Sequence, residues 1–597
     1  MAKSKEVESK AEKEKPGDTI AHRLAKKQRE ISVAEFFEKN RHLLGFDNKR
    51  KALLTAVREA VDNALDACEE ARIMPEVNIE IIDLSEKFEK VIEKKVVPEG
   101  QTTLVTEEEE TKKEAEDQKK GRRYRVIVED NGPGIVKNQI PNIFAKLLYG
   151  SKFHSLKQAR GQQGIGISAA ALYGQLTTGK PIRITSRISP KYSANYYELT
   201  INTQENKPNI VAEKQVEWQK EHGTKVEIDL DGIYQKGIQS VDSYLKQTAI
   251  ANPHVTIIYT NPLAEQFVYA RAADHLPSEP KEIKPHPYGV ELGRLIKMLS
   301  TTDSRTLQSF LTNEFSRVGN ETAKLICQNA GLLTTTKPEK MTREMAEKLE
   351  QGIQKTKLMS PPTDCLSPIG AEELEKGLKK EIRAEFYTAI SRPPEVYRGN
   401  PFIIEAGIAF GGEQSAEDSI TLLRFANRVP LLYQQGACCM YKSAVQTKWK
   451  TYGLQQSRSS LPIGPCTVMI HMASAWVPYT SESKEAIANY PEIEKEVRLA
   501  LQECGRKLAL YVLKKRRILA EGKKRSYIEL YIPHVAEALK ELLGLKEKDE
   551  EKVKDFLKDL LEKQRGKLEE IQVGTEEFSE AYALEKEERE GEENVQE

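Results

Sequence analysis

The apolar side chains of residues 48–72 recur at three- and four-residue steps, the spacing of one face of an α-helix. The stripe comprises Leu53, Leu54, Val57, Val61, Ala64, Leu65 and Cys68. The pattern predicts a helix from Asn48 to Arg72 that buries this stripe. Glu59 and Asn63 are four residues apart and point away from the stripe, so they share a polar face. That face is compatible with simple solvation as well as with a functional site.

Six further segments alternate apolar and polar residues, which is typical of half-buried strands. They span residues 77–83, 124–129, 182–186, 196–201, 225–230 and 255–259. The charged segment of about residues 84–123, which contains the run Glu107 to Glu110, is predicted to be an exposed insertion. Helices combined with a mostly antiparallel sheet make the predicted class of this region α+β.

Proline-rich stretches divide the rest of the chain, first after residue 276 and again at residues 361–362. A helical segment with turns at Gly319 and Gly331 lies between them. A second α/β unit follows, with strands expected at 402–410, 420–425 and 467–472 and helices at about 491–515 and 526–570. The predicted domains are a tail and N-terminal strap (1–47), the first α+β region (48–285), a helical domain (286–365), the second unit (366–530) and a helical extension with an acidic tail (531–597).

The composition fits a large protein with several buried cores. The chain has 597 residues, of which 39% are hydrophobic, and this length allows about four domains. No run approaches the ~18 apolar residues of a membrane span, and no apolar segment precedes a signal cleavage site. We therefore expect no membrane association. The seven cysteines are scattered without a CxxC pair, so reduced thiols in the cytoplasm are expected.

The charge balance places any nucleic-acid contact in local patches. The 91 lysines and arginines equal the 91 acidic residues, so no global charge attracts a polyanion. One basic cluster, Lys514 to Arg517 with Lys523 to Arg525, lies at the end of a predicted helix. It is a candidate for contacts with DNA phosphates, and an ordinary solvated helix end is the alternative.

A candidate binding element is the strand end Glu129-Asp130-Asn131-Gly132-Pro133-Gly134. An aspartate at such a position can accept a hydrogen bond from an exocyclic amine such as that of adenine. The glycines would let a flat ligand approach the main chain. Asn-Gly is also an ordinary turn signal, so a purely structural turn is the alternative.

Three glycines precede a small-residue helix in Gly161-Gln162-Gln163-Gly164-Ile165-Gly166-Ile167-Ser168. Main-chain N–H groups and the helix dipole would favour a phosphate there, and a flexible loop is the alternative. Ser151 and Lys152 add a hydroxyl and an ammonium group just before this lid. The segment 174–180 fits a P-loop until Pro181 replaces the Ser/Thr that would bind Mg²⁺, so we reject that motif.

The helix with Glu59 and Asn63, the Asp130 turn, the glycine lid and the strand entry at Thr224 occur in an order that resembles the GHKL ATPase superfamily. That superfamily includes gyrase-type topoisomerases, MutL mismatch-repair proteins, heat-shock ATPase chaperones and histidine kinases. Within it, the chain is most similar to the B subunit of topoisomerase VI, the archaeal type IIB enzyme. The stretches that carry this resemblance, and that together cover most of residues 31–530, are Ser32-Val33-Ala34-Glu35-Phe36-Phe37, Glu59-Ala60-Val61-Asp62-Asn63-Ala64-Leu65-Asp66, the lid, Phe315-Ser316-Arg317-Val318-Gly319 and Trp449-Lys450-Thr451-Tyr452.

The resemblance implies a fold, two cofactors and a set of site residues. The fold would be a GHKL (Bergerat) ATPase α/β sandwich, a helix-two-turns-helix insert and an α/β transducer domain with a long C-terminal helix. ATP would bind with Mg²⁺. Glu59 would orient and deprotonate the attacking water, and Asn63 would give Mg²⁺ a side-chain oxygen. The implied nucleotide-binding residues are Asn63, Asp130, Gly132, Gly134, Ser151, Lys152, Gly161, Gln162, Gln163, Gly164, Ile165, Gly166, Ile167, Ser168, Thr224 and Lys450.

Two of these implications concern regions beyond the first sheet. Lys450 resembles the lysine that transducer domains place against the γ-phosphate, so it is a second catalytic candidate; a surface lysine beside Lys448 is the alternative. Residues 315–330 resemble the helix-two-turns-helix module, and an ordinary helical hairpin is the alternative.

The implied activity is strand passage by a type II topoisomerase. Two copies would dimerise on ATP binding and, with a tyrosine-bearing A subunit that cuts double-stranded DNA, form an A₂B₂ heterotetramer. A MutL-like repair ATPase is the main rival, but it lacks a helical insert such as residues 286–365. A chaperone would turn over ATP independently of DNA, and a histidine kinase would need a phosphoacceptor helix, for which His22 is too isolated.

Overall fold

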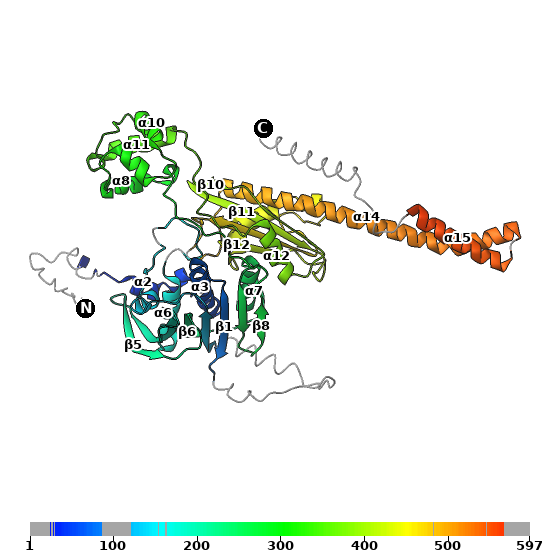
Figure 1. Ribbon diagram of the computed structural model, residues 1–597, viewed down its shortest axis with the longest axis horizontal. Coiled ribbons are helices and arrows are strands. Elements are labelled where there is room, and N and C mark those ends of the chain that lie inside the picture. Colours follow the sequence, from blue (N-terminus) through cyan, green and yellow to red (C-terminus); the bar gives the residue numbers. More distant parts are fainter. Residues whose placement is uncertain are drawn as a thin grey trace, which may run out of the picture.

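The computed structural model describes residues 24–25, 28, 30–85, 121–152, 155–161, 164–481, 483–544 and 546–565. Most of the predicted tail, the bulk of the charged insertion, the acidic C-terminal end, and Gln162 and Gln163 of the lid lie outside the described residues. Figure 1 shows a two-sheet body, a helical lobe beside it and a long helix that runs away from both.

The first sheet has eight strands in the order β5-β4-β3-β6-β2-β1-β7-β8. Its pairs are antiparallel apart from β1 and β7, which run parallel. The strands are β1 (Glu76–Asp83), β2 (Arg122–Asp130), β3 (Ile182–Arg187), β4 (Ala194–Asn202), β5 (Lys207–Val216), β6 (Gly223–Gly232), β7 (Thr256–Thr260) and β8 (Gln266–Tyr269). The predicted α+β class is thus confirmed.

Helices α3 (Lys49–Glu70), α5 (Ile140–Ala145), α6 (Gly166–Thr178) and α7 (Val241–Ala251) contact this sheet. Helix α3 begins after Asn48, whose side chain caps it by accepting a hydrogen bond from Lys51 N at 2.9 Å. The predicted stripe from Leu53 to Leu65 is buried in the core between α3, α6 and the sheet, and Cys68 is also buried. The polar face of α3 is therefore turned to the opposite side. Short helices α2 (Val33–Lys39) and η1 (Arg41–Leu44) precede α3.

Strands β5 and β8 were not predicted because neither shows an alternating pattern. Both are edge strands, and most of their side chains are exposed on both faces of the sheet. An edge strand buries only a few side chains, so period-two patterning is weak there, and charges such as Lys207 and Glu213 protect the open edge from pairing.

The helical lobe contains α8 (Leu292–Thr301), α9 (Leu307–Glu314), α10 (Asn320–Ala330) and α11 (Arg343–Lys355) around a small core of its own. The two predicted turns mark the start and the end of α10. Gly319 is the N-cap of α10, and Gly331 ends it in the left-handed conformation with φ 66°.

The second unit is built on a six-stranded sheet with the main order β10-β11-β14-β12-β13, and β9 pairs with β11. Helices α12 and α14 contact this sheet, and α13 packs against α14. The elements are α12 (Ala371–Glu381), β9 (Phe386–Ser391), β10 (Glu395–Tyr397), β11 (Asn400–Phe410), β12 (Thr421–Ala426), β13 (Val429–Pro430), α13 (Cys439–Gln446), η5 (Trp449–Tyr452), β14 (Cys466–Ser474) and α14 (Pro491–Leu543).

Helix α14 is longer than the sequence predicted. It runs through the predicted boundary at residue 530 and joins two segments that were expected to be separate helices. The intervening lysines, arginines, leucines and alanines are good helix formers, and the helix continues through Pro533 despite the loss of one main-chain hydrogen bond. Helix α15 (Glu547–Arg565) folds back against its outer part, where Lys540 and Glu550 form an ion pair at 2.9 Å.

The two units share a packed junction. Ile250 and Ala251 of α7 join Leu374 of α12 and Phe425 of β12 in one buried apolar cluster. Gly377 of α12 lies so close to the main chain of Ile250 that a Cβ would collide with its carbonyl oxygen. The first unit, which contains α3, therefore packs directly against the second unit.

Candidate functional site

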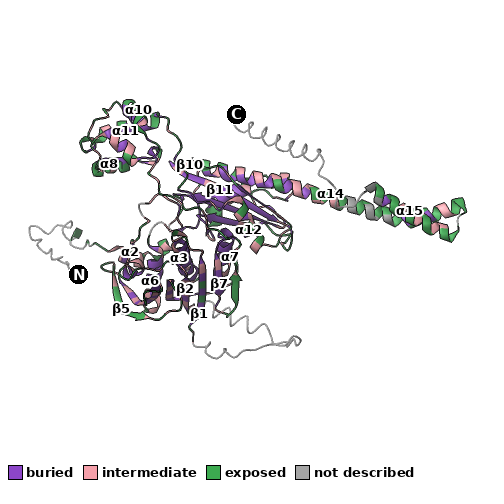
Figure 2. Cartoon of the chain, viewed as in Figure 1, coloured by how far each residue is buried: buried purple, intermediate pink, exposed green. Residues whose placement is uncertain are grey.

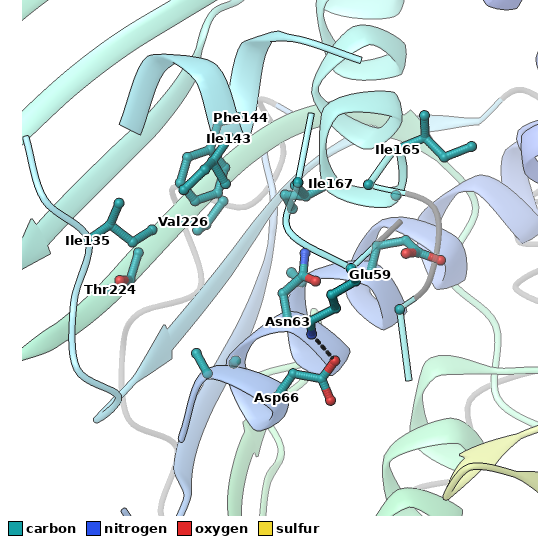
Figure 3. A pocket seen from close by; sticks show the side chains of 18 of the residues that line it. Glu59, Asn63, Asp66, Ile135, Ile143, Phe144, Ile165, Ile167, Thr224 and Val226 are labelled. Carbon is teal, nitrogen blue, oxygen red and sulfur yellow. Dashed lines mark hydrogen bonds and ion pairs between the residues drawn. The ribbon is translucent and has the colours of Figure 1, made fainter. Parts of the chain in front are cut away.

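A cavity of about 610 Å³ opens on the polar face of α3. Its size lies within the range of about 300–1,000 Å³ that is usual for ligand pockets. The walls include α3, the Asp130 turn at the end of β2, α5, residues 149–152, and the lid with the N-terminus of α6, as the close-up in Figure 3 shows in part. Among the described residues, one residue of the second unit also lines the cavity. The predicted residues that line it are Glu59, Asn63, Asp130, Gly134, Ser151, Lys152, Gly161, Gly164, Ile165, Gly166, Ile167 and Thr224.

Glu59 is held at the wall of the cavity by its neighbour on α3. Its Oε1 accepts hydrogen bonds from Arg58, the shorter one from Nη2 at 2.9 Å. Burial favours the neutral acid, but the positive charges of Lys484 and Arg58 outweigh burial and hold the pKa of Glu59 below its ordinary value. Glu59 is therefore ionised at neutral pH, as a proton acceptor must be.

Asn63 stands one turn further along α3 and is exposed to the cavity. Among the described residues, no cluster of three or more His, Cys, Asp or Glu side chains is arranged to hold a metal ion. Mg²⁺ commonly binds proteins through one or two oxygens and completes its shell with water and substrate phosphates. The single amide oxygen of Asn63 fits that mode of binding.

Asp130 lines the cavity from the end of β2. Its Oδ1 accepts hydrogen bonds from the main-chain N–H groups of Gly132 at 2.8 Å and Thr224 at 3.1 Å. Within the described part of the chain, no group donates a hydrogen bond to Oδ2, so that oxygen is available to a ligand. Burial raises the pKa of Asp130 to about 6, although the two main-chain donors act in the opposite direction.

The glycines of the Asp130 turn serve the packing of the protein itself. Gly134 has φ 71°, and a Cβ there would collide with the carbonyl oxygen of Arg187 at the end of β3. A Cβ at Gly132 would lie 2.9 Å from Asp130 Oδ1, and Gly132 is not among the residues that line the cavity. The sequence predicted that both glycines allow a base to approach. The close packing of this turn is a second reason why glycine occupies these two positions.

Lys152 lines the cavity and is paired with a carboxylate of α3. Its Nζ lies 2.6 Å from Asp66 Oδ2, the contact marked in Figure 3. Burial lowers the pKa of Lys152, but Asp66 and Glu70 raise it by more, so the ammonium remains charged. Ser151 precedes it on the same wall.

The lid ends at the N-terminus of α6, directly above Glu59. A Cβ at Gly166 would collide with Glu59 Oε2, so only glycine fits there. No side chain caps α6, which leaves the amides of its first turn directed at the cavity. Ser168 is buried and donates its hydroxyl to Ile165 O at 3.1 Å, so it supports the turn from behind and does not line the cavity.

Lys450, which the sequence predicted to reach the nucleotide, does not line the main cavity. Lys450 lies in η5 and lines a different hollow of about 450 Å³ with Arg516 of α14. The cation of the second unit that lines the main cavity is Lys484, which lies between β14 and α14. Sequence reasoning missed it because the sequence around Lys484 has no regular apolar period and no recognisable motif. The prediction for Lys450 rested on the resemblance of the Trp449 stretch to transducer domains, and Trp449 itself is a buried core residue.

Lys484 is fixed in place by its neighbours. Its Nζ donates to the carbonyl oxygen of Arg160 at 2.9 Å, immediately before the lid. Ser483 O accepts from Arg58 Nη1 at 3.1 Å, and Glu485 forms an ion pair with Lys51. Helix α3 therefore binds this loop at the residues on both sides of the lysine.

Two family models match the chain. One is described as "Histidine kinase-, DNA gyrase B-, and HSP90-like ATPase" and matches residues 48–231; the other is "Topoisomerase VI B subunit, transducer" and matches residues 361–525. The type 2 DNA topoisomerase 6 B subunit of Methanococcoides burtonii is 48% identical over 525 residues, which cover 88% of this chain and 79% of that protein. The chain belongs to the family of type 2 DNA topoisomerase 6 B subunits.

A second relative agrees with this membership. The type 2 DNA topoisomerase 6 B subunit of Archaeoglobus fulgidus is 45% identical over 521 residues, which cover 87% of this chain and 80% of that protein. The resemblance inferred from the motifs is confirmed, and the family favours a topoisomerase B subunit over the MutL-like alternative. Among solved structures, the B-subunit of DNA gyrase from Myxococcus xanthus matches 79% of this chain and 94% of its own, with a TM-score of 0.36 and 10% identity.

Within the described part of the chain, no helix combines the length and the apolar character that crossing a bilayer requires.

Proposed function

We propose that this chain is the ATP-hydrolysing subunit of a type II DNA topoisomerase, which passes one duplex through a transient break in another. The observation that carries the proposal is the composition of the main cavity. It joins an ionised carboxylate on α3, Glu59, to a cation of the transducer unit, Lys484. A site of this kind lets the second unit respond to the state of a nucleotide bound in the first.

Each wall of the cavity has a part in ATP hydrolysis. Adenine would donate its amino group to Oδ2 of Asp130, and the phosphates would take the amides at the start of α6 together with Ser151 and Lys152. Glu59 would accept the proton of the attacking water. Lys484 would stabilise the charge that develops on the γ-phosphate.

Asn63 would give Mg²⁺ its one protein oxygen, with the remaining positions left to water and phosphate oxygens. Bound there, the ion would neutralise phosphate charge during the attack. The lid residues Gln162 and Gln163 are part of the same proposal through the family resemblance.

The outer part of the molecule offers a surface for a partner. Helices α14 and α15 expose a series of large apolar side chains far from the two sheets, where Figure 2 shows mostly exposed residues. They are Leu519, Tyr527, Ile528, Leu530, Tyr531, Val535, Leu542, Leu543, Phe556 and Leu560. Exposed apolar groups in this number are typical of an interaction surface. We assign this surface to the A subunit, which carries the cutting tyrosine in the proposed A₂B₂ assembly.

Contacts with DNA are assigned to basic groups of the second unit and the helical lobe. Lys450 and Arg516 line one hollow, and Arg516 is oriented by a hydrogen bond to Gly453 O at 3.2 Å. Lys514 and Arg517 are exposed on the same stretch of α14. The N-terminus of α10 at Gly319 is a further candidate for a phosphate contact.

The proposal is tested with the full chain and its A subunit on catenated plasmid DNA. ATP-dependent release of single circles, together with dimerisation of the chain in a non-hydrolysable ATP analogue but not in ADP, is the expected result. ATP turnover without any decatenation would instead support a GHKL ATPase with another task, such as mismatch repair.

A further inference from the structure

The three residues immediately before the lid, Gln158, Ala159 and Arg160, form a stem that is bound by the second unit. Gln158 and Ser367 exchange two hydrogen bonds, Gln158 Nε2 to Ser367 O at 2.9 Å and Ser367 N to Gln158 Oε1 at 2.7 Å. Gln158 N also donates to Cys365 O at 2.9 Å. Cys365 and Ser367 lie within the segment that matches the transducer.

The other two stem residues are bound through their carbonyl oxygens. Ala159 O accepts from Asn427 Nδ2 at 3.0 Å, and Arg160 O accepts from Lys484 Nζ at 2.9 Å. Each stem residue is thus tied to the second unit, although the stem itself belongs to the ATPase region. The stem is therefore held in place by the second unit.

The side chain of Arg160 anchors the stem to α3. Its guanidinium donates to Asp66 Oδ1 at 2.9 Å and to Glu69 Oε1 and Oε2 at 2.6 and 2.9 Å, and it also contacts Asn252. Arg160 is 4% exposed. A buried arginine with a bidentate carboxylate partner has a well-defined position. The carbonyl group of the same residue, and with it the acceptor for Lys484, is thereby held in place.

The second unit reaches the stem through a strained turn. Asn427 and Arg428 connect β12 to β13 with φ values of 48° and 66°, which is the backbone of a two-residue turn that favours glycine at its second position. Arg428 instead donates to Ser367 O and Oγ, both at 2.9 Å, and lies 3.4 Å from Glu69. Strain at a non-glycine residue is a pointer to function when its side chain makes such contacts.

We propose that the stem fixes the position of Lys484, and that Arg160 is the positioning residue that holds this lysine beside Glu59. The proposal rests on the function proposed for the main cavity and adds the residues that keep its lysine in place. Gln158 and Asn427 support the same arrangement, because they bind the stem to the second unit on either side of Lys484's acceptor.

The test uses neutral substitutions outside the cavity, because Arg160→Ala would leave Asp66 and Glu69 without their partner and could prevent folding. Gln158→Ala and Asn427→Ala each remove hydrogen bonds between the stem and the second unit. Gln175→Ala is a matched control: Gln175 makes the same pair of hydrogen bonds, but to Ile201 within the first unit, at 3.1 and 2.7 Å. Steady-state ATP hydrolysis and ADP affinity are measured on the full chain.

We expect Gln158→Ala and Asn427→Ala to lower kcat about tenfold, since displacements of the order of 1 Å cost up to ~10²-fold, while ADP affinity stays within about threefold. The Gln175→Ala control should keep the wild-type kcat. In a Lys484→Ala background, neither stem substitution should lower kcat further, because the stem acts through that lysine. Arg160→Lys, if folded, should retain more activity than Arg160→Ala.

Wild-type kcat in both stem variants, or losses that add fully to that of Lys484→Ala, would overturn the proposal. A second readout does not depend on turnover. Hydrogen exchange at Thr480 and Ala488, whose amides are bonded within the Lys484 loop, should accelerate in Gln158→Ala and not in Gln175→Ala. If the wild-type chain failed to hydrolyse ATP, the proposed function would fail, and the exchange rates would still decide whether the stem positions the Lys484 loop.

Discussion

Lys484 lines the main cavity and Lys450 does not, so the roles of the two lysines can be compared directly by replacing each with alanine. Lys484→Ala removes the ammonium group of a residue that is 8% exposed and lines the cavity, and whose charge lowers the pKa of Glu59. The substitution adds no backbone strain, because lysine and alanine are equally disfavoured at the φ of 52° that residue 484 adopts. Lys450→Ala removes the same group from a separate hollow.

The expected effect follows from the position of the lost charge. Removing one preorganised donor to a developing anion costs about 2.7–4 kcal/mol, or ~10²–10³ in kcat. Lys484→Ala should therefore lower kcat by that factor while ADP affinity changes little. The pKa of Glu59 should also rise, because Lys484 is the largest of the influences that lower it. The acid limb of the kcat profile should then move to higher pH.

Lys450→Ala should leave ATP turnover without DNA within about threefold of the wild type. Its effect should appear in DNA binding, as a decrease of about 0.9 in the slope of log affinity against log salt. The assay is steady-state ATP hydrolysis from pH 5 to 9, with and without plasmid. A ~10²-fold loss in Lys450→Ala combined with normal turnover in Lys484→Ala would refute the reasoning and restore the assignment made from the sequence.

Three further outcomes are expected. Glu59→Gln should lose ~10²–10⁴ in kcat because the general base is gone, yet it should still dimerise with ATP; near-normal turnover would exclude Glu59 as the base. ATP affinity should fall by up to tenfold per unit as pH drops below about 6, since only ionised Asp130 offers Oδ2 as an acceptor, and Asp130→Asn should lose this pH dependence. Tyr531→Asp should abolish co-purification with the A subunit without changing ATP turnover, and retained binding would argue against the α14 surface.

Periodicity alone located the element that positions the chemistry. The stripe of Val57, Val61 and Ala64 identified α3 and the direction of its polar face, and Asn48 marked its start. The central strands were visible for the same reason, because they bury one residue in two. The order of Glu59, Asp130 and the lid then indicated the ATPase class before any geometry was known.

Contacts between distant segments could not be predicted in this way. Lys484 follows Glu59 by several hundred residues, and its loop has neither a regular period nor a recognisable motif. Its place in the cavity depends on the junction of two domains and on Arg58 binding Ser483. The length of α14 also escaped prediction, because the charged segment between residues 515 and 526 has no apolar period and was left between two predicted helices.

The central claim is that ATP bound in the main cavity drives the passage of one duplex through another. The most direct test is relaxation of a supercoiled plasmid by the full chain together with its A subunit. We predict relaxation in even-numbered linking-number steps that requires ATP and is lost in Glu59→Gln and Lys484→Ala. Relaxation of equal rate without ATP, or in the Glu59→Gln complex, would contradict this claim.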